Sequence, residues 1–177
     1  MKHKVVITDA SPLIALARIE HIHLLKDLFT EVFLTDIVEK EVLAGGDFVD
    51  SKAIRQAIKE GWLQVGDSAS YLAAASDIST EVEGLDPGEA TSILWAADLF
   101  QSGQDVMLIM DEAKGRKIAR RLSLETMGSA GIIATAKRLG SIEHAKPLLL
   151  QLQASGYYLS PTVIEMALQI AGEDVKS

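Results

Sequence analysis

Two short, uninterrupted apolar runs, each leading to an aspartate, constrain the fold of this chain most. Residues 5–7 are Val-Val-Ile and lead to Asp9, and residues 106–110 are Val-Met-Leu-Ile-Met and lead to Asp111. Apolar runs without alternation are typical of strands in a parallel sheet covered on both faces. Ligands bind beyond the carboxyl ends of such strands, so Asp9 and Asp111 are the first candidates for chemistry. Each aspartate could instead only cap the helix that follows it.

Helical patterns separate the predicted strands, which indicates an α/β fold with a mainly parallel sheet. The strands are expected at 5–7, 32–34, 62–65, 106–110 and 125–127. Helices are expected from the Ser11-Pro12 cap, from Thr35 or Asp36 to Gly45-Gly46, and at 50–60, 87–103, 113–122, 129–138, 143–154 and 161–171. Residues 67–84 are ambiguous, with a short helix expected at 71–75.

The composition predicts one soluble domain. The chain has 177 residues, of which 48% are hydrophobic and 24% charged, close to globular averages. It contains no cysteine, which excludes disulfides, thiolate zinc sites and cysteine nucleophiles and favours the cytoplasm. We expect neither a signal peptide nor a membrane span, because polar residues interrupt the longest uncharged run at 147–164. The net charge of −8 argues against binding nucleic acid through bulk charge.

Two glutamates lie on the apolar side of predicted helices. Glu41 shares a face with Val38, and Glu89 shares one with Ile93. A carboxylate buried there needs a cation, a metal ion or hydrogen-bond donors. The alternatives are that Glu41 reaches water from the margin of its face, and that Glu89 is the capping-box partner of Asp86.

Asp9, Glu41, Glu89 and Asp111 would repel one another if they met without cations. Oxygen ligands select hard ions, so the set predicts a site for Mg²⁺ or Mn²⁺. A pair of such ions activates water and stabilises the departing oxygen in phosphodiester cleavage. The predicted substrate is therefore a phosphate ester.

One local basic face interrupts the acidic chain. It starts just after Asp111 and could either be a solvated helix surface or contact the phosphates of a strand that enters the acidic site. Arg116 is the member best placed to reach that site. The face consists of Lys114, Arg116, Lys117, Arg120 and Arg121.

Several segments, taken in order, carry a family resemblance. They are Val-Ile-Thr-Asp9-Ala-Ser-Pro, Val38-Glu-Lys-Glu41-Val, Leu-Asp-Pro-Gly-Glu89-Ala, Met110-Asp111-Glu-Ala-Lys-Gly-Arg116 and Gly128-Ser129-Ala-Gly131. The set resembles the PIN-domain ribonucleases, in particular a prokaryotic branch related to VapC-type toxins. The resemblance covers most of residues 4–140, and the C-terminal helices also suit that branch.

This resemblance implies a three-layer α/β/α domain over residues 1–177, with 141–177 as a helical extension packed on it. It also implies an endoribonuclease that cleaves single-stranded RNA with Mg²⁺ or Mn²⁺ and is the toxin of a toxin–antitoxin pair. Its metal-binding and catalytic acids would be Asp9, Glu41, Glu89 and Asp111. The residues expected to bind RNA are Ser11, Lys114, Arg116, Lys117 and Ser129.

Other functions stay open at this point. A PIN-like fold that no longer holds metal productively would be an interaction module for protein or RNA. A phosphotransferase with Asp9 as nucleophile usually needs a second aspartate two residues on, and position 11 is serine. The leucine-rich C-terminal helices either form a homodimer interface or complete the core. Tyr157 and Tyr158 favour core or interface over a platform for bases.

Overall fold

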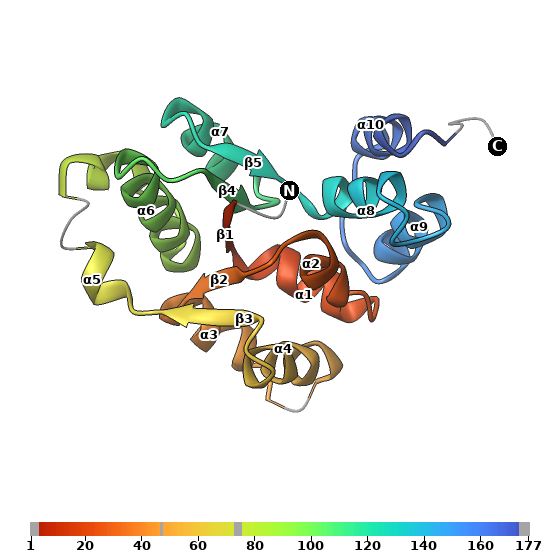
Figure 1. Ribbon diagram of the computed structural model, residues 1–177, viewed down its shortest axis with the longest axis horizontal. Helices are drawn as coiled ribbons and strands as arrows, with labels where there is room; N and C mark the ends of the chain where they lie inside the picture. The colour runs from red at the N-terminus through yellow and green to blue at the C-terminus, as the bar shows by residue number, and fades with distance from the viewer. Residues whose placement is uncertain (1–3, 47, 73–75, 174–177) are drawn as a thin grey trace.

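A parallel five-stranded sheet forms the centre of the molecule (Figure 1). The computed structural model describes residues 4–46, 48–72 and 76–173. The strands are β1 (Val5–Thr8), β2 (Val32–Thr35), β3 (Leu63–Gly66), β4 (Val106–Ile109) and β5 (Glu125–Met127). Their order is β3-β2-β1-β4-β5, and every adjacent pair is parallel. The predicted α/β class and the parallel sheet are confirmed.

Helices cover both faces of this sheet. The helices before β4 are α1 (Ala10–Arg18), α2 (His23–Leu28), α3 (Asp36–Leu43), α4 (Val49–Lys59), α5 (Ser68–Leu72), the 3₁₀ helix η1 (Ser76–Val82) and α6 (Pro87–Gln101). Those after β4 are α7 (Ala113–Arg121), α8 (Ser129–Arg138), α9 (Lys146–Ala154) and α10 (Pro161–Ala171). In Figure 1, α6 and α7 lie on one side of β1, and α1, α2 and α8 lie on the other.

Successive side chains of β1 point to opposite faces of the sheet and so belong to two different apolar layers. Val6 belongs to the larger buried cluster, which includes α1, α8 and the C-terminal helices. Ile7 points to the opposite face and belongs to the smaller cluster with Ile93 of α6 and Ile118 of α7. A strand buried on both faces explains why the β1 segment carries no polar alternation.

Some helices begin or end at other residues than the hydrophobic pattern and the capping residues of the sequence predict. The first helix begins at Ala10, with Asp9 and not Ser11 as its N-cap residue. The short helix α2 was not predicted; its N-cap residue, Ile22, is itself helical and offers no capping side chain. The helix expected at 71–75 lies instead at Ser68–Leu72, and residues 73–75 fall outside the described residues.

Short junctions connect the strands to the helices that follow them. Asp9 is the only residue between β1 and α1, and α3 follows β2 directly. The Thr35 hydroxyl accepts a hydrogen bond of 3.1 Å from the Val38 N–H and so caps α3. Because all strands are parallel, these junctions gather at one edge of the sheet, where the candidate residues also lie.

Most of the leucines in the C-terminal segment are buried in the core, and few are exposed to solvent. Leu149 and Leu152 of α9 are fully buried, and Leu159 is 7% exposed, whereas Leu150 is 50% exposed. Glu173 fastens the end of this segment to the start of α9, because its Oε1 accepts from Ala145 N at 2.7 Å. Its Oε2 accepts from Lys146 N at 3.0 Å. No helix among the described residues is long and apolar enough to cross a membrane.

Removing the Glu173 carboxylate should loosen the C-terminal helices. Partial burial raises the pKa of Glu173, but the N–H donors of Ala145 and Lys146 outweigh that effect and the pKa is lowered overall. We expect Glu173→Ala to lower the free energy of unfolding by about 1–2 kcal/mol in urea titrations near neutral pH. Because the folded-state pKa is lowered, this loss should fade as the pH falls through that pKa.

Glu165→Ala provides a matched control, because Glu165 is exposed on α10. It should leave the free energy of unfolding within about 0.5 kcal/mol of the wild-type value. Equal losses in the two variants would contradict the role assigned to Glu173.

Candidate functional site

Asp9 lies at the centre of the candidate site and is 2% exposed. Its backbone N–H donates to the Ile109 carbonyl at 2.9 Å, which ties the end of β1 to the end of β4. Asp9 is the N-cap residue of α1, but no N–H group of the helix meets the geometry of a capping hydrogen bond to its side chain. The nearby N–H groups of Ala10 and Ser11 stabilise its charged form only in part, because burial outweighs them.

The surroundings of Asp9 disfavour its charged form. Burial raises the pKa of Asp9 to about 7, the backbone N–H groups of Ala10 and Ser11 oppose the rise, and the charges of Glu89 and Glu41 add to it. A carboxylate placed in this way is stabilised by any cation that reaches it. Strongly perturbed groups of this kind concentrate at functional sites.

Glu41 approaches Asp9 across the first turn of α6. A Cβ on Gly88 would lie 2.7 Å from Glu41 Oε2 and 3.6 Å from Asp9 Oδ1. The glycine therefore leaves room for both carboxylates beside the backbone of α6. Glu41 itself is exposed, so it reaches the site from the margin of its helix face, as one of the two sequence alternatives described. Partial desolvation and then the charge of Asp86 raise its pKa.

Glu89 serves both functions that the sequence left open. Burial is the largest influence that raises the pKa of Glu89, and the backbone N–H of Asp86 lowers it. The contact with Asp86 is the one expected of a capping-box glutamate. The charges of Glu112, Asp86 and Glu41 also raise this pKa, so Glu89 lies within the acidic group while it caps α6.

Asp111 is held by three hydrogen bonds at the end of β4. The Ser129 N–H donates to Asp111 Oδ1 at 2.8 Å, and the Ser129 hydroxyl donates to Oδ2. The Tyr157 hydroxyl donates to the same Oδ2 at 2.6 Å. A Cβ on Gly128 would lie only 2.6 Å from Oδ1, so the glycine permits this close approach. Asp111 therefore has a fixed orientation.

The residues predicted to bind RNA divide into two groups. Ser11 and Arg116 line a cleft of about 510 Å³ together with Asp111 and Glu112. Arg116 is half-buried, and its Nη1 lies 3.6 Å from the Cβ position of Gly128, beside Asp111. Both side chains are therefore placed where a phosphate could meet them.

The other three residues of that prediction lie differently. Ser129 is fully buried, and its hydroxyl donates to Asp111 and so orients that carboxylate. Lys114 donates to the Gly84 carbonyl at 2.5 Å and so fastens α7 to the preceding loop. Lys117 is exposed and, in the described part of the chain, makes no ion pair with the acidic residues.

Tyr157 is the site residue that sequence reasoning missed. It follows Gly156, a left-handed residue with φ of 89°, in the segment between α9 and α10. Burial and the charge of Asp111 raise the pKa of Tyr157, so its hydroxyl remains a proton donor near neutral pH. The available signal was a tyrosine pair between a helix-ending glycine and the Ser160-Pro161 helix start, but this pattern gives no partner for the hydroxyl.

The four predicted acids offer the oxygen donors that divalent cations prefer, but they do not form a complete ligand set among the described residues. All four predicted acids supply oxygen, and burial or mutual charge raises the pKa of Asp9, Glu41 and Glu89. The four acids do not form one compact set, because Asp9, Glu41 and Glu89 interact as one group while Asp111 is held by Ser129 and Tyr157. Within residues 4–46, 48–72 and 76–173, no three acidic or histidine side chains approach closely enough to complete a metal-ligand set.

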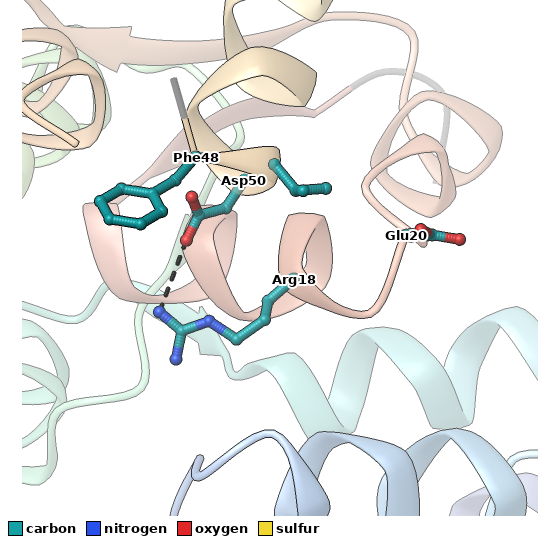
Figure 2. A pocket seen from close by; sticks show the side chains of 5 residues that line it. Arg18, Glu20, Phe48 and Asp50 are labelled. Carbon is teal, nitrogen blue, oxygen red and sulfur yellow. Dashed lines mark hydrogen bonds and ion pairs between the residues drawn. The ribbon is translucent and has the colours of Figure 1, made fainter. Parts of the chain in front are cut away.

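A separate cavity lies at the other end of α1 from Asp9. Figure 2 shows it beside the ion pair between Arg18 Nη2 and Asp50 Oδ2, which are 3.4 Å apart. It has a volume of about 480 Å³, and Phe48 at its rim is 71% exposed. None of the predicted site residues lines it, so we place the candidate chemistry at the acidic edge of the sheet.

Comparison with known proteins agrees with this choice. Residues 5–173 match a family described as PIN domain. The matched region begins with β1 and includes α9 and α10. A search of curated proteins gives no match.

Replacing Asp9 by asparagine should stabilise the protein in a pH-dependent way. Because the folded-state pKa is raised to about 7, the folded protein binds more protons than the unfolded chain between about pH 4 and that value. The free energy of unfolding therefore falls as the pH rises through this window, and the full penalty applies above it. We expect Asp9→Asn to raise the Tm by several degrees near pH 8, with the two proteins converging near pH 4.

Scanning calorimetry in the absence of divalent cations measures the Tm of the wild type and of Asp9→Asn at each pH. A Tm difference that does not change with pH would contradict the electrostatic origin of the effect. A large loss of Tm in the variant would show that Asp9 has a structural role.

Proposed function

Because this chain belongs to the PIN-domain family, whose members are generally nucleases, we propose that it is a metal-dependent endoribonuclease that hydrolyses phosphodiester bonds of single-stranded RNA. The observation that carries this proposal is Asp9, a buried carboxylate with a pKa of about 7, because no basic side chain pairs with it in the described structure and the N–H groups of Ala10 and Ser11 only partly offset its burial. Glu41 and Glu89 raise that pKa further, so the arrangement is stabilised when a divalent cation binds.

The acidic residues would hold Mg²⁺ or Mn²⁺. Asp9, Glu41 and Glu89 would supply oxygen ligands from one side of the site, and Asp111 would supply them from the other. When bound, such an ion activates water and stabilises the departing oxygen of a phosphodiester. Hard oxygen donors select these ions over softer metals.

Two side chains of the cleft would bind the substrate. The Arg116 guanidinium can donate to phosphate oxygens with charge-assisted hydrogen bonds. The Ser11 hydroxyl lines the same cleft and can donate to a phosphate oxygen as well. The positive charge of Arg116 offsets repulsion between the phosphate and the acidic residues, which favours binding with the reacting phosphate near Asp111.

Cleavage of a labelled pool of single-stranded RNA tests this function. We expect cutting with Mn²⁺ or Mg²⁺, none with EDTA, and a loss of at least about 100-fold in Asp9→Asn, because a ligand and charge of the site are removed. Asp27→Asn is the matched control, since Asp27 is exposed on α2, which precedes the opposite end of β2. It should cut at the wild-type rate.

Two results would contradict the proposal. Cutting that persists in EDTA or in Asp9→Asn would exclude this site as the source of the activity. No cutting, together with no Mn²⁺ binding in calorimetry, would favour the interaction module for protein or RNA.

We further propose that the nuclease is the toxin of a toxin–antitoxin pair in the cytoplasm, with an antitoxin that inhibits it by covering the acidic cleft. The support is the order of motifs around Asp9, Glu41, Glu89 and Asp111. Exposed side chains on α9 and α10, such as Leu150 and Met166, offer an apolar surface for the antitoxin or for a second copy of the chain.

The toxin role predicts growth arrest. Induced expression in a bacterial host should stop growth, and the arrest should disappear with Asp9→Asn but persist with Asp27→Asn. Normal growth at equal protein levels of wild type and Asp9→Asn would contradict the toxin role without affecting the nuclease proposal.

A further inference from the structure

The Asp111 carboxylate is nearly saturated with hydrogen bonds. Its Oδ2 accepts from the Ser129 hydroxyl and from the Tyr157 hydroxyl, the latter at 2.6 Å. Its Oδ1 accepts from the Ser129 N–H at 2.8 Å. An ionised carboxylate has about four lone-pair positions, so three are occupied by these donors. The open position is on Oδ1.

Tyr157 reaches Asp111 from a segment that the C-terminal helices hold in place. Its own N–H donates to the Leu152 carbonyl at 3.3 Å, at the end of α9. The Gln153 side chain donates to the Leu159 carbonyl at 3.2 Å and so closes the segment that contains Tyr157. Leu159 is buried, whereas the neighbouring Tyr158 is 85% exposed. The hydroxyl of Tyr157 is therefore delivered by a fixed loop.

Ser129 and Tyr157 act on the carboxylate from different parts of the chain. Ser129 begins α8, directly after Gly128, and supplies two of the three donors. Tyr157 supplies the third from 46 positions away in the sequence. Without Tyr157, one of the lone pairs on Oδ2 would become open and could compete with Oδ1 for a cation.

We propose that Tyr157 is a positioning residue of the nuclease site, which occupies Oδ2 of Asp111 and so leaves Oδ1 as the oxygen available to a divalent cation. This inference rests on the proposed function. Tyr157 lines the same cleft as Ser11 and Arg116, but its hydroxyl proton is donated to Asp111 and so is not directed at the substrate. Its effect passes through the orientation of Asp111, as outer-shell donors orient metal-binding carboxylates in other sites.

Tyr157→Phe removes the hydroxyl and keeps the ring. We expect the Kd for Mn²⁺, measured by calorimetry on the full chain, to rise about tenfold. The kcat for RNA cleavage at subsaturating Mn²⁺ should fall by a similar factor, while the KM for RNA stays unchanged. Tyr158→Phe is the matched control for metal binding and should leave the Kd for Mn²⁺ unchanged, because Tyr158 lines the same cleft but is exposed and lies outside the contacts with Asp111.

A second variant keeps the test decisive if Tyr157→Phe loses stability. Tyr157→Leu removes the hydroxyl together with the ring. Its Kd for Mn²⁺ should equal that of Tyr157→Phe when the two are compared at temperatures below both Tm values. A rise in Kd in Tyr157→Leu that is absent from Tyr157→Phe would show that the ring, and not the donated hydrogen bond, is what matters.

The remaining outcomes separate this inference from the proposed function. If the wild-type protein neither binds Mn²⁺ nor cuts RNA, both fail. If the wild type cuts RNA and Tyr157→Phe matches it in Kd and kcat, only the positioning role fails. A lower Kd in Tyr157→Phe would show that the hydroxyl competes with the cation, which also overturns the positioning role.

Discussion

Desolvation of the Asp9 carboxylate is the constraint on which the rest of the site depends. The junction between β1 and α1 is one residue long, so Asp9 is fixed at the carboxyl end of a strand that is buried on both faces. Its charged form is disfavoured first by burial and then by Glu89 and Glu41, which raises its pKa to about 7. The fold therefore maintains an unfavourable charge arrangement that a cation would relieve.

Glycines decide how closely the backbone can approach these acids. Gly88 leaves room beside α6 for Glu41 and Asp9, and Gly128 does the same for Asp111 at the start of α8. The two positions differ in how well they would tolerate an added methyl group. Glu41 is an exposed, flexible side chain that can move away from an added methyl group, whereas Asp111 is short and held by three donors. The approach at Gly128 is therefore the stricter requirement.

The sequence predicts the parts of this arrangement that local pattern controls. Continuous apolar runs locate β1 and β4, and the residues after them are Asp9 and Asp111. Helical periodicity also selects Glu41 and Glu89, but it does not show that Glu41 is exposed, because the margin of a helix face depends on its neighbours. Nor does it show that Ser129 is buried against Asp111. The contact with Tyr157 joins residues 46 positions apart, so it depends on how α9 and α10 pack.

Distribution of the acids along the chain makes ion binding depend on tertiary structure. Asp9 and Asp111 follow adjacent strands, whose pairing through Ile7 and Leu108 fixes the ends from which they project. Glu41 and Glu89 come from α3 and α6, and the Thr91 hydroxyl of α6 lies 3.1 Å from the Thr35 hydroxyl that caps α3. One of the three donors to Asp111, the Tyr157 hydroxyl, comes from the C-terminal segment that Glu173 fastens. Because no local segment contains the whole set, a cation that binds these acids must stabilise the folded state relative to the unfolded chain.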